Sequence, residues 1–183
     1  PCNFDTFTIN SGGFILKLTQ SGEGTEIFQT ANEIVNITID LEDNLIVSMI
    51  KYMTHPYWSD WTSLAKLSST GQVLWQHPIV GYNGTISYPE TESNLNIIEV
   101  GTYQTAAWIR LNKYTSEGSA ISDRTFPYTG ASDIKRTLDD NFILQGLYKQ
   151  DCIIGDSVLN SNGEEDAFIA KIDTSFNTIW IKY

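Results

Sequence analysis

Two acidic stretches are the first places in this chain where side chains could do chemistry: Glu42-Asp43-Asn44 and Asp139-Asp140-Asn141. Their oxygens suit Ca²⁺, but a calcium site needs six or more oxygens around one ion. Neither stretch has the alternating acids, glycine and distal glutamate of an EF-hand loop. Asp and Asn also favour turns, because their side chains bond to the nearby backbone. We therefore predict that both stretches are β-turns, and we expect neither a metal nor a cofactor.

Residues for enzymatic catalysis do not stand out. The two histidines, His55 and His77, have no partner at the spacing of zinc ligands. The sequence has no G-x-S-x-G elbow, phosphate loop or dinucleotide fingerprint. Glycoside hydrolysis needs only two well-placed carboxylates, and nothing selects a pair among the 22 acidic residues. We therefore predict a protein that is not an enzyme, with a glycoside hydrolase or lyase as the weakest alternative.

One aromatic segment, residues 52–61, is a candidate binding loop. It contains Tyr57, Trp58 and Trp61. Tyr and Trp on a loop can stack on a sugar or anchor a protein partner. In the alternative reading Trp61 begins the next strand and Tyr57 only covers the loop. The segment makes a carbohydrate-binding, lectin-like role the main alternative to a protein-interaction role.

Two sequons mark candidate glycosylation sites, Asn36 and Asn83, each followed two residues later by Thr. Asn83 lies in a glycine-containing segment where a glycan could project. Asn36 opens an expected strand, where a glycan would be more crowded. Both sites matter only if the protein passes through a secretory pathway.

The elements that would position these residues repeat along the chain. Four apolar runs, at residues 14–18, 63–67, 107–111 and 167–172, each carry a basic residue next to last. These basic residues are Lys17, Lys66, Arg110 and Lys171, at steps of 49, 44 and 61. A second marker is formed by Asn44, Asn96 and Asn141, at steps of 52 and 45. Two markers with one rhythm indicate a repeated structural unit.

Each unit contains about four short β-rich runs separated by turn residues, without the 3.6-residue period of a helix. We therefore predict an all-β protein, a β-propeller of about four four-stranded antiparallel blades. A sandwich would not repeat every four strands, and a solenoid has a shorter period. The expected units are 1–30, 31–80, 81–128 and 129–183. The first lacks its opening strand, and residues 4–10 are its expected second strand.

The fourth unit resembles the blade repeats of bacterial-type extracellular β-propeller proteins, I-x-x-T-x-D-D/G-N/G-x-I-x-x-G followed by D-A-F-x-x-K-L/I-D-x-x-G-N-x-x-W. The matching residues are Thr137, Asp139, Asp140, Asn141, Gly146, Asp166, Ala167, Phe168, Lys171, Asp173, Asn177 and Trp180. The resemblance spans nearly the whole chain. It implies the fold and an extracellular or cell-surface location, and says little about activity because the motif residues belong to turns and core.

Ring closure would make the first and last units neighbours. The two cysteines, Cys2 and Cys152, lie in these units and could form a disulfide that ties the ends. Two free thiols, or pairing outside this chain, are the alternatives. The repeated basic residues are expected to pair with acidic turns of adjacent units, such as Asp43 or Asp140, although a ring of cations could instead bind an anion. The chain forms either a small four-bladed ring or part of a larger assembly.

The net charge and the apolar runs limit the classes of partner that we expect. The net charge is −11, from 22 acidic and 11 basic residues, which excludes the clustered cations of a nucleic-acid surface. No apolar run approaches 20 residues, so we expect no membrane span. Pro1-Cys2 is not a natural translation start, so we expect a processed or trimmed piece. The sequence thus favours a structural or protein-interaction module that binds a protein partner or itself, with carbohydrate as the alternative ligand.

Overall fold

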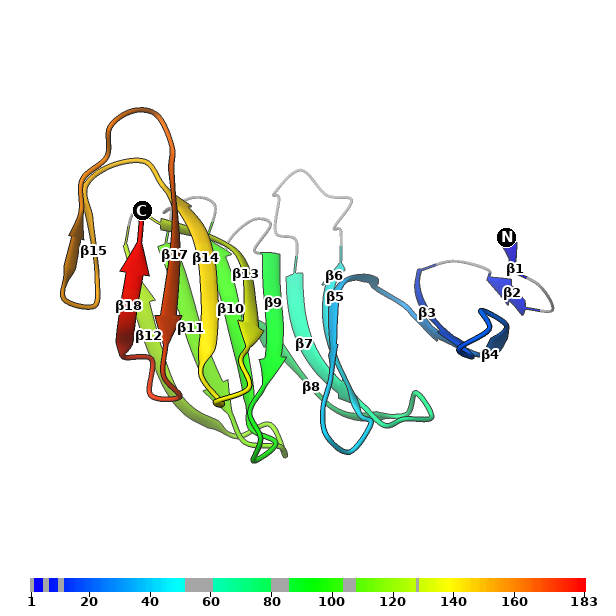
Figure 1. Ribbon diagram of the computed structural model, residues 1–183. Coiled ribbons are helices and arrows are strands. Elements are labelled where there is room, and N and C mark those ends of the chain that lie inside the picture. The colour runs from blue at the N-terminus through cyan, green and yellow to red at the C-terminus, as the bar shows by residue number, and fades with distance from the viewer. Residues whose placement is uncertain are drawn as a thin grey trace.

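The computed structural model describes residues 2–4, 7–9, 12–51, 61–79, 86–103, 108–127 and 129–183. These residues form β-strands in antiparallel sheets, and no helix occurs among them (Figure 1). The predicted all-β class is therefore confirmed.

Three sheets have four strands each, and each sheet comes from one continuous part of the chain. The second unit contains β5 (Glu33–Ile39), β6 (Leu45–Lys51), β7 (Trp61–Leu67) and β8 (Val73–Ile79). The third unit contains β9 (Ile86–Thr91), β10 (Ile97–Tyr103), β11 (Trp108–Tyr114) and β12 (Ala120–Phe126). The fourth unit contains β13 (Thr129–Arg136), β14 (Phe142–Tyr148), β17 (Asp166–Ile172) and β18 (Thr178–Lys182). In every unit the strands pair in chain order.

Two short hairpins and one partial unit complete the described strands. The first unit is the pair β3 (Gly13–Leu18) and β4 (Gly24–Thr30). A hairpin of β15 (Cys152–Ile154) and β16 (Ser157–Leu159) is inserted into the fourth unit between β14 and β17. At the N-terminus β1 (Cys2–Phe4) pairs with β2 (Phe7–Ile9). The expectation that residues 4–10 supply the second strand of the first unit is therefore wrong, because β2 pairs with β1 and not with β3.

Among the described residues, seven hairpin turns share one hydrogen-bond pattern. They begin at Thr19, Asp40, Ser68, Glu92, Thr115, Thr137 and Asp173. In the turn that begins at Asp40, its N–H donates to the Asn44 carbonyl (3.0 Å), and Asp43 N–H donates back to the Asp40 carbonyl (3.2 Å). The fourth residue of each turn has positive φ; these residues are Gly22, Asp43, Gly71, Leu95, Gly118, Asp140 and Phe176. The acidic stretches at 42–44 and 139–141 thus form turns, as predicted.

The units stack face to face, and a unit with two neighbours is buried on both faces (Figure 1). On one side of β6, Leu45 and Val47 pack with Ile15 and Phe28 of the first unit. On its other side, Ile46 packs with residues of the third unit. The third and fourth units share a further core, which includes Ile98, Leu111, Phe142 and Leu144. Alternate residues of a middle strand therefore serve the interfaces with the preceding and the following unit.

The structure corrects the alignment of the third repeat. Lys66 lies opposite Ile46, and Lys171 lies opposite Ile143. Each of these isoleucines is the second residue of the second strand of its unit, β6 or β14. In the third unit the residue at this position is Lys113, opposite Ile98. Arg110 lies three residues earlier on β11. The sequence pattern aligns Arg110 with Lys17 and Lys66 because each of the three precedes a leucine. With Lys113 the steps become 49, 47 and 58, and the longest contains the β15–β16 insert.

Candidate functional site

The repeated lysines form ion pairs with carboxylates of their own units. Lys66 Nζ lies 2.9 Å from Asp40 Oδ2, and both side chains are almost fully buried. Lys113 Nζ lies 2.5 Å from Glu92 Oε1 at the equivalent turn. Lys171 Nζ lies 2.7 Å from Asp139 Oδ2. The expected pairing of these lysines with adjacent units is therefore wrong. Each carboxylate belongs to the turn between the first and second strands of the lysine's own unit.

The pair in the second unit is held by several hydrogen bonds. Asp40 Oδ1 accepts from the backbone N–H groups of Glu42 and Asn44, both at 2.9 Å. Burial of Asp40 favours its protonated form, but hydrogen bonds from the Lys66 ammonium and from Asn44 outweigh this effect and hold the pKa of the carboxyl below its ordinary value. The carboxylate therefore stays charged at neutral pH. It fixes the turn and the lysine together.

Other polar groups join neighbouring units. Glu90 on β9 accepts a hydrogen bond from Thr38 Oγ1 of the second unit (3.3 Å) and one from the Arg136 backbone of the fourth unit (3.4 Å). The turn of the third unit also reaches the fourth, where Ser93 Oγ donates to Asp140 Oδ2 (2.5 Å). The first strands of these units, β5, β9 and β13, contact one another in turn. Glu90 thus links three consecutive units through their first strands.

At the other edge of each sheet, the outer strand covers a turn of the following unit. Trp75 on β8 donates through Nε1 to the Ser116 carbonyl (2.9 Å). Arg124 on β12 donates through Nη1 to the Phe176 carbonyl (2.6 Å). Phe28 on β4 lies directly over Gly71, and His77 on β8 lies over Gly118. The positive-φ residue of a turn therefore forms part of the contact with the preceding unit.

Glu99 is a buried carboxyl that forms no ion pair with a repeated lysine. Glu99 is fully buried on β10, at the position that Val47 and Leu144 occupy in other units. Burial raises the pKa of Glu99 above its ordinary value, although a hydrogen bond from Asn112 Nδ2 (2.6 Å) and the nearby charge of Arg110 act in the opposite direction. The sequence analysis missed this residue. A glutamate inside the apolar run 97–100 was the available signal.

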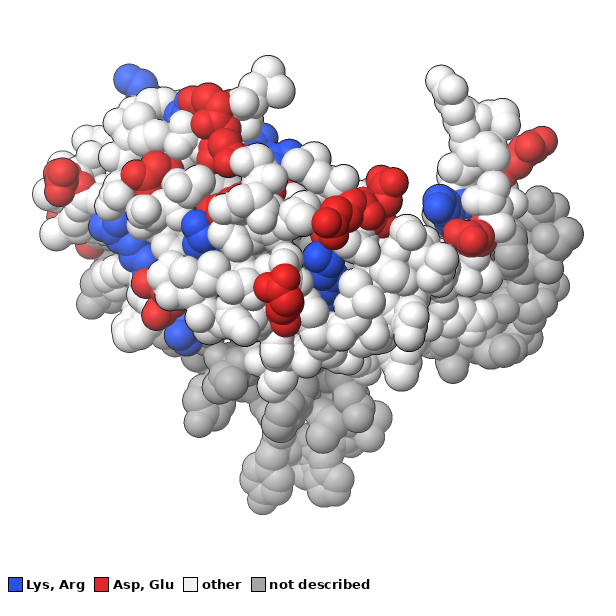
Figure 2. Space-filling view, turned by 90° about the horizontal axis from the view of Figure 1, so that it is seen from below, with Lys and Arg blue, Asp and Glu red and all other residues white. Residues whose placement is uncertain are grey.

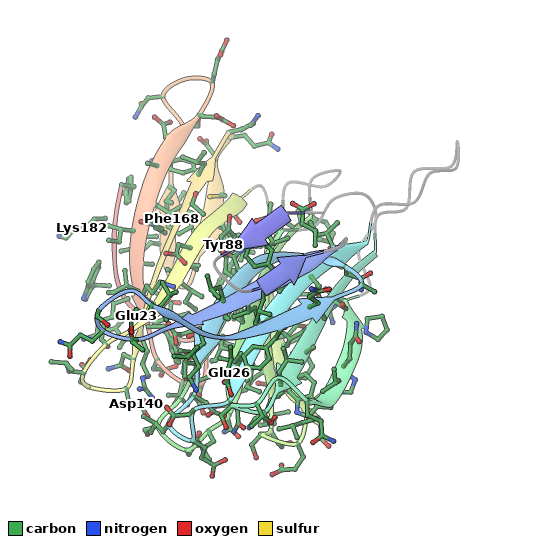
Figure 3. All side chains as sticks on the ribbon, turned by 90° about the vertical axis from the view of Figure 1, so that its right-hand side faces the viewer. Glu23, Glu26, Tyr88, Asp140, Phe168 and Lys182 are labelled. Atoms are coloured by element: carbon green, nitrogen blue, oxygen red, sulfur yellow. The ribbon has the colours of Figure 1, made fainter. Side chains whose placement is uncertain are left out.

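The two ends of the stack leave faces uncovered. A hollow of about 530 Å³ lies on the open face of the fourth unit, and its lining includes Leu147, Phe168, Ile169 and Lys182. Figure 3 shows Lys182 at the edge of this unit and Glu23 on the hairpin of the first unit. The rim that carries the short turns, seen in Figure 2, bears acidic and basic side chains close together. The hollow is a candidate binding surface among the described residues.

The aromatic loop and one sequon cannot be placed. Tyr57, Trp58 and Asn83 lie outside the described residues, as does the side chain of Trp61, whose backbone begins β7. The second candidate glycosylation site, Asn36, lies on β5, where its Nδ2 donates to the Ser87 carbonyl of the third unit (2.9 Å). A glycan on Asn36 would have to displace this contact between units.

The expected disulfide between Cys2 and Cys152 is not formed. Cys152 is a buried free thiol on β15, where burial raises its pKa. Figure 1 shows β1, which carries Cys2, at the opposite end of the stack from β15. The expectation depended on a ring that brings the first and last units together. In this structure these units lie far apart.

The described residues contain neither a metal-binding cluster nor a membrane-spanning helix. No group of three or more His, Cys, Asp or Glu side chains in this part of the chain is arranged to hold a metal ion. Within the same ranges, no helix has the length and apolar character needed to span a membrane.

Comparisons with known proteins give a likeness of fold. No protein-family model matches the chain, and no curated protein matches it. A solved protein of unknown function from Bacteroides caccae is similar, with 8% identity and a TM-score of 0.51 over 92% of this chain and 72% of that one. Two mutants of Synechocystis apocarotenoid oxygenase also match, at 10% identity with TM-scores of 0.49 and 0.47, and this chain covers 43% and 39% of them. At such identities the likeness to the Bacteroides caccae protein concerns the fold alone.

Proposed function

We propose that this chain is a non-enzymatic β-propeller module that acts as a structural or protein-interaction scaffold outside the cell or on its surface. The propeller arrangement is supported by the order of the units. Consecutive four-stranded sheets stack face to face, and their first strands β5, β9 and β13 lie next to one another. Propeller blades are four-stranded sheets set around a central channel, so their innermost strands are neighbours in the same way.

The functional proposal rests on the contacts that the repeated charged residues make. Lys66, Lys113 and Lys171 each pair with a carboxylate of their own unit. Glu90 and Asp140 accept hydrogen bonds from neighbouring units. These residues hold turns and units together, which is the role of a scaffold. The hollow on the fourth unit is the described surface that we propose for binding, as is common for exposed apolar surfaces.

A glycan array tests this proposal against the carbohydrate-binding alternative. We expect the 183-residue chain to bind no sugar on the array, and we expect the Tyr57→Ala/Trp58→Ala double variant to behave in the same way. Trp108→Ala, at a half-exposed position of β11, is the control for loss of an aromatic side chain elsewhere. Sugar binding that disappears in the double variant and persists in the control would overturn the proposal in favour of a lectin-like role.

A further inference from the structure

We propose that a proton held by Glu99 closes the interface between the second and third units, so that this interface loosens when the proton is lost. Glu99 belongs to a group of buried polar side chains at this interface. The interface between the third and fourth units has apolar residues at the equivalent positions. The proposal goes beyond the scaffold role and does not depend on what the scaffold binds.

Glu99 and Ser48 occupy two positions that are apolar in the next interface. Glu99 is the third residue of β10 and faces the second unit, as Leu144, the third residue of β14, faces the third unit. Ser48 is the fourth residue of β6 and faces the third unit, as Val100, the fourth residue of β10, faces the fourth unit. Leu144 and Val100 belong to one apolar core. A carboxyl and a hydroxyl therefore take the places of two aliphatic side chains.

Two further polar side chains extend this group. Asn112 lies opposite Glu99 on β11, at a position that is alanine in the second and fourth units. Ser87 on β9 stands where the fourth unit has Ala131. Ser48, Ser87 and Glu99 have no exposed surface, so the group is closed to bulk water. The polar group is thus a feature of this one interface and not of the repeat.

The hydrogen bonds of the group leave one oxygen of Glu99 without a donor. Asn112 Nδ2 donates to Oε2 (2.6 Å), whereas Oε1 has no hydrogen-bond partner among the described residues. Asn36, the cross-strand neighbour of Ser48, donates to the Ser87 carbonyl (2.9 Å) and so brings the two serines together. The Ser87 hydroxyl lies near the Glu99 carboxyl without the geometry of a hydrogen bond. A proton on Oε1 can be donated to a serine hydroxyl, which removes the cost of a buried unpaired oxygen.

The charges that face Glu99 do not replace this proton. Among the described residues, the charged or titratable side chains on the facing sides of the two sheets are Arg110, Tyr114 and Asp123 in the third unit and Glu33, Lys66 and His77 in the second. Arg110 acts on the Glu99 carboxyl, but its Nη2 also lies 3.3 Å from Asp123 Oδ2. Burial outweighs these influences, and the pKa of Glu99 lies above its ordinary value.

A second buried carboxyl shows what a compensated charge requires in this chain. Asp40 is buried too, but it has the Lys66 ammonium at 2.9 Å and two backbone N–H donors, and its pKa is lowered. Glu99 has an amide donor and a guanidinium that it shares with another carboxylate. The two carboxyls should therefore change the stability of the chain in opposite directions as the pH changes.

The contribution of Glu99 to stability has a definite sign. It is complete below the ordinary pKa of a glutamate, and it is lost as the pH rises through the raised pKa of Glu99. Above that value the interface must hold an uncompensated charge or open until water reaches the carboxylate. The second and third units should therefore be held together more tightly in acid than at neutral pH.

Thermal unfolding of the 183-residue chain and of its Glu99→Gln variant, between about pH 4 and pH 8, tests the proposal. Glutamine keeps the shape of the neutral carboxyl and cannot ionise, and all other titrating groups are common to both chains. We expect the melting midpoint of the parent to fall relative to that of the variant as the pH rises. A difference that stays constant with pH, or that changes in the opposite direction, would overturn the proposal.

The matched control is Glu33→Gln, the same change at an exposed glutamate on the facing side of β5. Its midpoint should keep a nearly constant offset from the parent. Because histidines also change charge in this range, the comparison is repeated with His77→Gln in both chains, and an effect that disappears there would assign the pH dependence to the histidine and contradict the proposal. If Glu99→Gln does not fold, the triple variant Glu99→Leu/Ser48→Val/Asn112→Ala replaces it. This variant rebuilds the apolar residues of the next interface, and the parent should lose stability relative to it in the same way.

Discussion

At the scale of single residues, equivalent lysines differ in how much their ion pairs contribute to stability. Lys66 and Asp40 form a pair with 5% and 1% of their side chains exposed, whereas Lys17 and Glu26 lie 3.7 Å apart in solvent. Removal of one partner of a buried pair leaves a buried charge without compensation, and an exposed pair contributes little. The ion pair at this position of the repeat therefore contributes much more to the free energy of unfolding in the second unit than in the first.

This difference gives a residue-scale prediction. Lys66→Met should lower the free energy of unfolding by roughly 3–5 kcal/mol, because Asp40 remains buried and charged. Lys17→Met is the matched control and should change it by roughly 0–1 kcal/mol. Urea unfolding at neutral pH measures both. Equal losses in the two variants would contradict the argument from burial.

Sequence reasoning reached some of these residues and missed others. The turns at 42–44 and 139–141 were predictable, because Asp and Asn favour turns through local hydrogen bonds. The lysine of the third unit was not, since Arg110 lies inside the apolar run 107–111 whereas Lys113 follows Asn112, and only the strand register identifies Lys113 as the equivalent residue. The candidate binding surface around Ile169 was also missed. Its apolar pattern matches that of its buried equivalents, and exposure depends on whether a neighbouring unit is present.

At the scale of elements, the positive-φ turns carry a second function. They let each hairpin close, and they also receive the outer strand of the preceding unit. Gly71 and Gly22 have similar φ angles of 80° and 88°, but only Gly71 is covered. The energetic cost of backbone strain can therefore be separated from that of lost packing by making the same substitution at Gly22 and at Gly71.

We predict that Gly71→Ala destabilises the chain more than Gly22→Ala. Both changes place a side chain in the left-handed region, which costs about 1–2 kcal/mol. At Gly71 the new Cβ must also displace the Phe28 ring, so the interface between the first and second units should open. Thermal unfolding of the two variants gives the comparison. An equal loss would show that Phe28 does not pack on this turn.

The element pattern was largely predictable from sequence, and its exceptions have physical reasons. Apolar runs bounded by turn residues predicted the strands of the second and fourth units and the first three strands of the third; β12 was not predicted, because its sequence AISDRTF has no apolar run. The β1–β2 pairing was not predicted, because so short a run fits either neighbour equally well. The β15–β16 hairpin was not predicted as a separate element either. Its strands have three residues each, which is too few for a clear alternation.

At the scale of the whole molecule, stability should vary along the stack. A unit in a linear array is stabilised by each neighbour that it contacts. The middle strands β6 and β10 are buried on both faces, whereas β14 alternates between buried and more exposed residues and β3 is mostly exposed. Sequence alone could not give this gradient, because repeated units look alike whether they are internal or terminal.

Hydrogen exchange should show this gradient directly. Amides of β10 should exchange most slowly and amides of β3 fastest, because β3 opens with little loss of buried contact. Exchange followed by mass spectrometry resolves these peptides. Faster exchange in β10 than in β3 would contradict the linear-array description.

The recurrence of one turn at seven places has a consequence for protein engineering. Because every hairpin on that rim closes in the same way, the second unit could serve as a template for tandem arrays of identical copies, with no new loop to design. The first refinement would be glycine in place of Asp43, whose backbone already adopts the positive φ (61°) that glycine tolerates best.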